Sequence, residues 1–244
     1  MDACIVYQAP YSKRRVGALG DGGYVICDMP GSYDGFISCG IGNDVSFENE
    51  FINMYPTLEC YAFDGTIDRL PPNYHKNIVF VRKNVGSCNT KNTTDLIEYI
   101  DGKSDVFLKM DIEGHEYLSI KTLIHNGMME RIKQLVLEVH TPVDIELYPD
   151  YFVGLQDIKY DDMLKMSSEI KKTHRLVHIH ANNACKIHHV NNSILVPNVF
   201  ECTFIRTTDN LEYNSDPIPS YLDYPNDPGQ KDIVLDGYPY KLGK

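Results

Sequence analysis

The sequence predicts an α/β protein of Rossmann-like fold, with a mostly parallel sheet of seven strands and helices on both faces. Three observations support this prediction. Short apolar runs alternate with segments whose apolar residues recur at helical spacing. The first strand ends in a glycine-rich turn at 40–42. The last two strands are joined without a helical pattern between them, which predicts an antiparallel pair at one edge of the sheet.

The strands follow from short apolar runs that end at turn residues. In chain order they are Phe36–Ile37 with the turn after it, Leu58–Phe63, Ile78–Val81, Asp105–Met110, Ile132–His140, Arg175–His180 and Phe200–Ile205. Amphipathic patterns predict helices from Phe47 to Tyr55, after a cap at Thr93-Thr94, over Ile120–Met128 and over Met163–Ile170. Between the sixth and seventh strands only a loop is expected, containing Asn191-Asn192 and Pro197. Because helix-linked strands are parallel neighbours, the first five strands form a parallel sheet.

The length of 244 residues and the hydrophobic content of 43% fit a single domain with a substantial core. We divide it into an N-terminal hairpin (1–35), a Rossmann-like core (36–206) and a C-terminal arm rich in Pro and Tyr (207–244). The run Asp21-Gly22-Gly23-Tyr24 predicts a turn entering a strand, and this turn is a candidate lid over a ligand. Five tyrosines in the arm favour docking over disorder.

Charge and cysteine content limit the partners. The net charge is -11, which argues against binding to nucleic acid or to an anionic membrane surface. The seven cysteines form no C-x-x-C pair, and neither a signal peptide nor a spanning apolar run is visible. We therefore expect a cytoplasmic protein; a homodimer stays open.

The glycine turn predicts a nucleoside site. Gly40, Ile41 and Gly42 allow close approach of a ligand to the main chain, and the following helix presents its free N–H groups there. Asp64 ends the second strand, where an acid binds a ribose through its two hydroxyls. Asn84 follows the third strand. A nicotinamide-binding turn would carry a third glycine where this chain has Val45, which counts against NAD.

Acids and imidazoles gather at the carboxyl ends of the later strands. The fourth strand leads into Asp111, Glu113 and His115, the fifth ends with Glu138 and His140, and the sixth ends at His180. Two explanations stay open. Asp111, Glu113, His115 and His140 are candidates for general-base catalysis. Asp111, Glu138, His140 and His180 are candidates for a divalent metal, Mg²⁺ or Mn²⁺.

Structural roles are the alternatives for the same residues. Asp111 can cap a helix, and acids in the first turn of a helix complement its dipole in any protein. Glu138 and His140 alternate on one face of a strand, so they can form a hydrogen-bonded core pair. His115 can be a surface residue.

Several motifs resemble those of the FkbM-type methyltransferases, a branch of the class I methyltransferases that use S-adenosylmethionine. They are Leu-Lys-Met-Asp-Ile-Glu-Gly-His-Glu (108–116), Gly-Asp-Gly-Gly-Tyr-Val (20–25), Gly-Ile-Gly-Asn-Asp-Val-Ser-Phe-Glu (40–48), Gln-Leu-Val-Leu-Glu-Val-His (134–140) and His-Ala-Asn-Asn (180–183). The resemblance implies the strand order 3-2-1-4-5-7-6, with strand 7 antiparallel.

The resemblance also implies roles. Gly40 and Gly42 would face the methionine part of the cofactor, and Asp64 would bind its ribose. Asp111 and Glu113 would lie near the transferred methyl group, and the turn from Asp21 to Tyr24 would cover the cofactor. The chain departs from the family where Ser38-Cys39 replaces the usual acid before the glycine turn, so the cofactor's amino group has no assigned partner.

Members of this superfamily usually methylate hydroxyl groups of sugars and secondary metabolites. The resemblance therefore implies O-methylation of a sugar, glycan or small polyhydroxyl acceptor, with N-methylation of an amino sugar as the close variant. An NAD(P)-dependent sugar oxidoreductase and a non-catalytic nucleoside-binding module remain the other readings.

Overall fold

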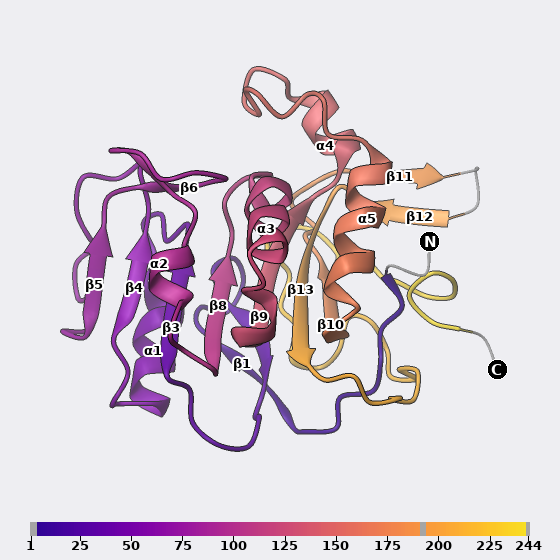
Figure 1. Cartoon of the computed structure of the whole chain (residues 1–244). Coiled ribbons are helices and arrows are strands. Elements are labelled where there is room, and N and C mark those ends of the chain that lie inside the picture. The colour runs from indigo at the N-terminus through magenta and orange to yellow at the C-terminus, as the bar shows by residue number, and fades with distance from the viewer. Residues whose placement is uncertain (1–3, 191–193, 243–244) are drawn as a thin grey trace.

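The computed structural model describes residues 4–190 and 194–242, and seven strands form its central sheet (Figure 1). From edge to edge they are β5 (Ile78–Val81), β4 (Cys60–Phe63), β3 (Gly35–Cys39), β8 (Val106–Met110), β9 (Ile132–His140), β13 (Val199–Arg206) and β10 (His174–Ala181). Within this sheet, β5, β4, β3, β8 and β9 are parallel to one another, and β13 is antiparallel to both of its neighbours. The predicted fold class and order 3-2-1-4-5-7-6 are confirmed. The outer limits of the predicted regions, residues 1 and 244, lie outside the described residues.

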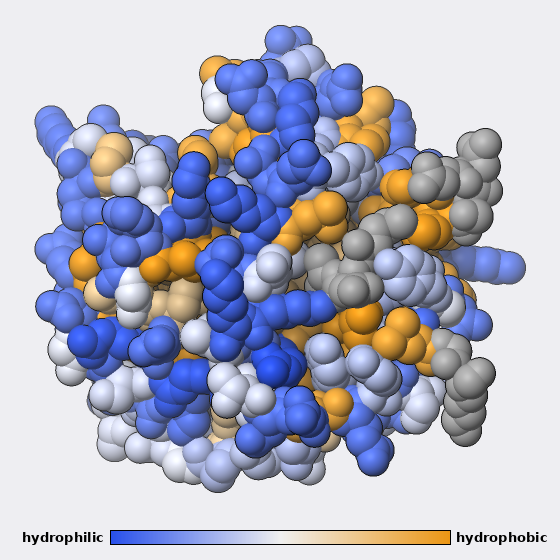
Figure 2. Space-filling model, turned by 45° about the vertical axis from the view of Figure 1, so that its right-hand side comes forward, coloured by the Kyte–Doolittle hydropathy of each residue, from blue (hydrophilic) through white to orange (hydrophobic). Residues whose placement is uncertain are grey.

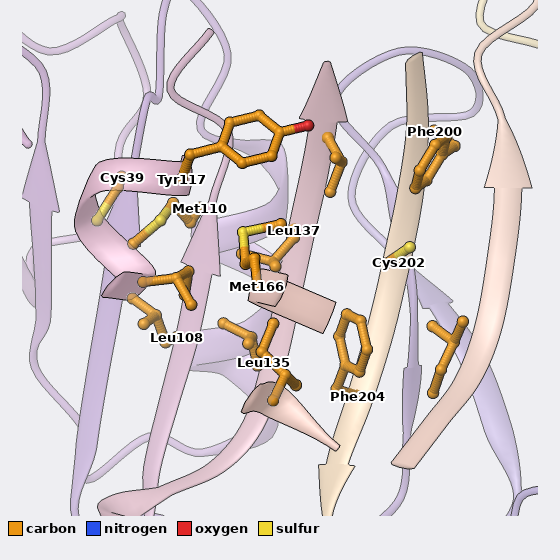
Figure 3. Close-up of a cluster of buried hydrophobic side chains, with 14 of the residues drawn as sticks. Cys39, Leu108, Met110, Tyr117, Leu135, Leu137, Met166, Phe200, Cys202 and Phe204 are labelled. Carbon is orange, nitrogen blue, oxygen red and sulfur yellow. The ribbon is translucent and has the colours of Figure 1, made fainter. Parts of the chain in front are cut away.

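One face of the sheet is covered by α2 (Ile97–Ile100), α3 (Glu116–His125) and α5 (Tyr160–Ile170) (Figure 1). Apolar residues of α3 and α5 recur every three or four positions, so each helix buries one stripe. Tyr117 of α3 and Met166 of α5 lie over Met110 and Leu137 of the sheet (Figure 3). Each fully buried side chain of this size stabilises the fold by roughly 1.5–3 kcal/mol.

The other face packs against α1 (Ser46–Met54) and a hairpin made of β1 (Lys13–Val16) and β2 (Tyr24–Cys27). Phe51 of α1 lies with its ring centroid 4.2 Å from that of Phe107 on β8. Thr203 Oγ1 of β13 donates a hydrogen bond to Val25 O at 2.5 Å, which fastens the hairpin to the sheet. β1 and β2 pair from Lys13 opposite Cys27 to Val16 opposite Tyr24, within the segment 1–35 where a hairpin was expected.

Thr93 and Thr94 do not cap a helix as predicted. They form β7 (Thr93–Thr94), which pairs in parallel with β6 (Asn84–Val85). β-branched residues favour extended backbone, and the neighbouring strand gives their main chain hydrogen-bond partners. The short helix α2 begins at Ile97, after Leu96 in a left-handed conformation with φ of 66°.

Three further segments differ from the sequence prediction. A hairpin of β11 (Ile187–Val190) and β12 (Ile194–Pro197) stands where only a loop was expected. The predicted loop residues Asn191 and Asn192 lie outside the described residues. After β9 the chain forms α4 (Pro142–Leu147), and a single 3-10 turn, Met129–Arg131, precedes β9. All of these are too short to leave a clear periodic pattern in the sequence.

The arm after β13 lies against the side of the sheet formed by β9, β13 and β10, and polar pairs hold it there. His178 Nε2 lies 2.8 Å from Asp223 Oδ1, and Asn183 exchanges hydrogen bonds with the main chain of Asp227. Tyr240 is buried, whereas Tyr221 is exposed. Tyrosines of the arm also make contacts, since the ring centroid of Tyr213 lies 5.5 Å from that of Tyr7.

No helix in residues 4–190 and 194–242 combines the length and the hydropathy needed to cross a bilayer. On the face drawn in Figure 2, hydrophilic side chains predominate and the hydrophobic ones form separate patches.

Candidate functional site

A cavity of about 670 Å³ opens at the carboxyl ends of β3, β4 and β8. Ligands of open parallel sheets bind at this edge. Of the predicted site residues, the cavity is lined by Asp21, Gly22, Gly40, Ile41, Gly42, Asp64, Asn84, Asp111, Glu113 and His115. Five others lie outside the lining: Gly23, Tyr24, Glu138, His140 and His180. A second hollow of about 660 Å³, beside Tyr7 and Arg175, contains none of the predicted site residues, so the first is the candidate site.

The glycine turn is fastened to both neighbouring strands. Gly40 N donates to Phe63 O at 2.8 Å, and Asp111 N donates to Cys39 O at 3.0 Å. Gly40 has a φ of 73°, and a Cβ there would lie 1.6 Å from Asp111 O. Gly42 has a φ of 49°, but a Cβ there would meet no atom within 4 Å. Gly40 is therefore required by packing, whereas Gly42 faces open space that a ligand can enter.

Asp64 is buried at the tip of β4, and the protein already uses most of its acceptor capacity. Gly42 N donates to Oδ2 at 2.9 Å, while the main-chain N and Oγ1 of Thr66 donate to Oδ1 at 2.7 and 2.6 Å. A carboxylate offers about four acceptor positions. One position is left for a ligand, so the predicted double hydrogen bond to a ribose would reduce to a single one.

The predicted lid turn contacts the glycine loop and the loop after β8. Asp21 and Gly22 line the cavity, and a Cβ on Gly22 would lie 2.6 Å from Asp44 Oδ2. Tyr24 OH donates to Asp111 Oδ2 at 2.7 Å. Burial, followed by the nearby charge of Asp111, raises the pKa of Tyr24 well above its ordinary value. The phenol is therefore a fixed donor that orients the Asp111 carboxylate.

The loop after β8 has an unusual backbone. Glu113 has a φ of 56° and Gly114 a φ of 84°, and a Cβ on Gly114 would lie 3.0 Å from Leu155. Glu116 Oε1 closes the loop by accepting from Ile112 N at 2.7 Å, and burial raises the pKa of Glu116 to about 7. Left-handed non-glycine residues are uncommon and cluster at functional sites.

His115 is half-buried at the start of α3 and lines the cavity. Within residues 4–190 and 194–242, its ring makes no hydrogen bond or ion pair. A neutral imidazole without a partner can accept a proton from a ligand.

His140 lies outside the cavity lining, among the acidic side chains of Glu113, Glu138 and Asp144. Its Nδ1 is 2.8 Å from Asp144 Oδ2, and its Nε2 is 3.2 Å from Glu113 Oε2 and 3.6 Å from Glu138 Oε2. Burial alone would lower the pKa of His140, but Asp144, Glu113 and Glu138 outweigh it and raise the pKa. His140 is therefore held as an imidazolium cation, with both nitrogens facing acids.

The four residues predicted to bind a divalent metal do not form a metal site. His180 Nδ1 is 3.3 Å from Glu201 Oε2, and His180 Nε2 is 3.1 Å from Asp232. Glu138 Oε1 accepts from Asn182 Nδ2 at 3.1 Å. A metal needs a free imidazole nitrogen, and both nitrogens of His180 are hydrogen-bonded to carboxylates. His140 uses Nδ1 on Asp144, and its buried Nε2, which makes no hydrogen bond among the described residues, lies at ion-pair distance from Glu113. In the described part of the chain, no group of three or more His, Cys, Asp or Glu can hold a metal ion. This corrects the set Asp111, Glu138, His140 and His180.

Two buried charges at the cavity were not singled out from the sequence. Glu48 of α1 and Lys109 of β8 line the cavity, and their side chains are 1% and 5% exposed. Ser38 Oγ donates to Glu48 Oε1 at 2.5 Å. One sequence signal was available, since Glu48 belongs to the buried stripe of α1 together with Phe47 and Phe51.

No protein-family model and no curated protein sequence matches the chain. Among solved structures it is similar to the plantazolicin methyltransferase BpumL in complex with SAH, with 7% identity, 72% of this chain and 77% of that chain covered, and a TM-score of 0.37. A 16S rRNA adenine methyltransferase from Catenulisporales acidiphilia with SAM shares 12% identity over 81% and 100% of the two chains, with a TM-score of 0.36. The fibrillarin pre-rRNA processing protein of Methanococcus jannaschii shares 12% identity over 82% and 84%, with a TM-score of 0.39.

Proposed function

We propose that the protein is an S-adenosylmethionine-dependent methyltransferase that acts on a hydroxyl of a sugar or other small polyhydroxyl acceptor. The observation that carries the proposal is the cavity of about 670 Å³, in which the glycine turn, Asp64 and the loop from Asp111 to His115 meet. Three of the motifs that resemble FkbM-type methyltransferases, at 20–25, 40–48 and 108–116, contribute residues to the lining of this cavity.

The residues fit such a cofactor. Gly42 faces open space, and the remaining acceptor position of Asp64 would hold one ribose hydroxyl. Asn84 and the turn at Gly22 line the same space. When bound, the cofactor supplies an activated methyl group, and the chain supplies its position and the path for the proton.

Methyl transfer to a hydroxyl needs a group that takes the acceptor's proton. We assign this role to His115 and Asp111, because both line the cavity and Asp111 is oriented by Tyr24. His140 is already a cation, so we assign it to holding Glu113 and Glu138 in place.

The acceptor class follows from the acids at the cavity. Asp21, Asp111 and Glu113 are hydrogen-bond acceptors, and Tyr151 lines the cavity beside them. Hydroxyl groups donate to carboxylates, and an aromatic ring supports the apolar face of a sugar. An amino sugar would satisfy the same groups, which keeps N-methylation as the close variant.

The test is titration calorimetry of the wild-type protein with S-adenosylhomocysteine and, separately, with NADH. We expect micromolar binding of the first and none of the second. Asp64→Asn should weaken S-adenosylhomocysteine binding about 10-fold, because a charge-assisted hydrogen bond to the ribose is lost.

Two arms complete the experiment. Repeating the titration with EDTA, Mg²⁺ or Mn²⁺ should leave the affinity unchanged, since no metal-binding group was found among the described residues. A wild-type protein that binds NADH but not S-adenosylhomocysteine would sink the proposal.

A further inference from the structure

We propose that Glu48 and Lys109 form the subsite for a zwitterionic α-amino-acid group, with Glu48 taking the ammonium and Lys109 the carboxylate. The inference rests on the proposed function, because the methionine end of the cofactor is the ligand part with this chemistry. Because Ser38-Cys39 stands at the end of β3 where related proteins carry an acid, the cofactor's amino group had no partner. The inference assigns that partner to Glu48.

The first observation is an unsatisfied acid. Glu48 Oε1 accepts from Ser38, but Oε2 is buried and has no hydrogen-bond partner in residues 4–190 and 194–242. A buried carboxylate oxygen without a partner costs about 1–3 kcal/mol or more, so its retention beside a cavity indicates a missing donor. An ammonium group is such a donor.

The second observation is the incomplete pairing of the base. Lys109 Nζ is 4.0 Å from Glu48 Oε1, at the limit of an ion pair, and donates to Gly40 O at 3.3 Å. It also lies 5.1 Å from the ring centroid of Tyr24. An ammonium has three N–H donors, and one strong acceptor in direct contact is still missing. A ligand carboxylate would supply it.

The third observation is position. Both side chains line the cavity next to the glycine turn, since Lys109 bonds to Gly40 and Glu48 follows that turn on α1. Burial raises the pKa of Glu48, although Lys109 and Ser38 oppose this shift. Burial also opposes the charge of Lys109, but Glu48 and Asp111 outweigh it and raise the pKa of Lys109, so Lys109 is charged. A ligand with one charge of each sign satisfies the pair without adding net charge to a buried site.

The experiment compares two ligands that differ only at the amino-acid end. S-adenosylhomocysteine carries it and 5′-methylthioadenosine lacks it. In calorimetry, Glu48→Gln should weaken S-adenosylhomocysteine binding about 10- to 100-fold and change 5′-methylthioadenosine binding less than about 3-fold. Glu50→Gln is the matched control, because Glu50 lies on the same helix, carries the same charge and is absent from the cavity lining.

Glu48→Gln leaves Lys109 buried without its acid, which could unfold the protein. The double variant Glu48→Gln with Lys109→Met removes both charges, so it avoids this unpaired charge and allows binding to be measured on folded protein. It should show the same selective loss. Equal losses for both ligands, or no loss for either, would overturn the subsite while the proposed function stands. A wild-type protein that binds neither ligand would overturn the proposed function itself.

Discussion

Residues at the cavity differ in what their neighbours leave them free to do. His115 and His140 both belong to motifs at strand ends, yet the ring of His115 has no partner among the described residues and His140 is surrounded by Asp144, Glu113 and Glu138. The same imidazole can therefore serve as a base at one position and as a fixed cation at the other.

The two glycines of the turn give a matched pair of variants. Gly40→Ala should lower the free energy of unfolding by about 3 kcal/mol or prevent folding, because its Cβ would overlap Asp111 O. Gly42→Ala should cost only about 1 kcal/mol, for the left-handed backbone, but should weaken S-adenosylhomocysteine binding. Urea unfolding and calorimetry measure both. Equal stabilities of the two variants would contradict the prediction.

His180 gives a pH-dependent prediction. Burial opposes its charge, but Glu201, Asp223 and Asp232 raise the pKa of His180 to about 9, above its ordinary value of 6.5. The charged form is thus favoured by folding, and its stabilisation is fully present below pH 6.5 and lost as the pH rises through 9.

In urea unfolding, the stability difference between wild type and His180→Gln should be roughly 3 kcal/mol larger at pH 6.5 than at pH 10. His125→Gln, at an exposed position, is the control and should show no such change. If this stability difference stays constant with pH, the charge of His180 contributes nothing to the free energy of unfolding.

At the scale of elements, the C-terminal arm contacts the candidate lid, the turn from Asp21 to Tyr24. Asn226 Nδ2 donates to Glu201 Oε1 at 2.9 Å and to Asp21 Oδ1 at 3.4 Å, so one arm residue connects β13 to the turn over the cavity. Arg15 of β1 lies 5.4 Å from the ring centroid of Tyr224. The arm therefore contacts the β1–β2 hairpin at its turn and at β1, and we expect these contacts to stabilise it.

Asn226→Ala should speed amide hydrogen exchange in the turn 17–23 and lower stability by about 1 kcal/mol, because both hydrogen bonds are lost. Tyr221→Ala, in the same arm but 89% exposed, should change neither. Hydrogen exchange of the turn that stays at the wild-type rate in Asn226→Ala would show that the arm does not brace it.

At the scale of the whole molecule, the net charge of -11 leads us to predict that the chain does not bind nucleic acid. We predict no saturable binding of a short labelled RNA duplex at physiological salt, with any Kd weaker than about 10⁻⁴ M. Fluorescence anisotropy at two salt concentrations measures it. Micromolar binding with a steep salt dependence would place an RNA among the acceptors instead.

Much of the fold could be predicted from the sequence because its strands and helices are locally encoded. Each apolar run and each helical stripe carries its own period, and the glycine turn is read from adjacent residues. Thr93-Thr94 shows the limit, since these residues pair with Asn84–Val85 and not with the helix that follows them. Such pairing depends on a segment elsewhere in the chain.

The sequence by itself determined the mostly parallel Rossmann-like sheet, because hydrophobic period and turn chemistry act between near neighbours. The strand order came from the resemblance to FkbM-type methyltransferases, and the structure has the same order. Only the tertiary structure decided which charges are free. Glu48 meets Lys109, His140 meets Asp144 and Glu113, and His180 meets Glu201 and Asp232. The protonation and availability of a buried group depend on the charges that folding brings to it, most of them from other segments of the chain.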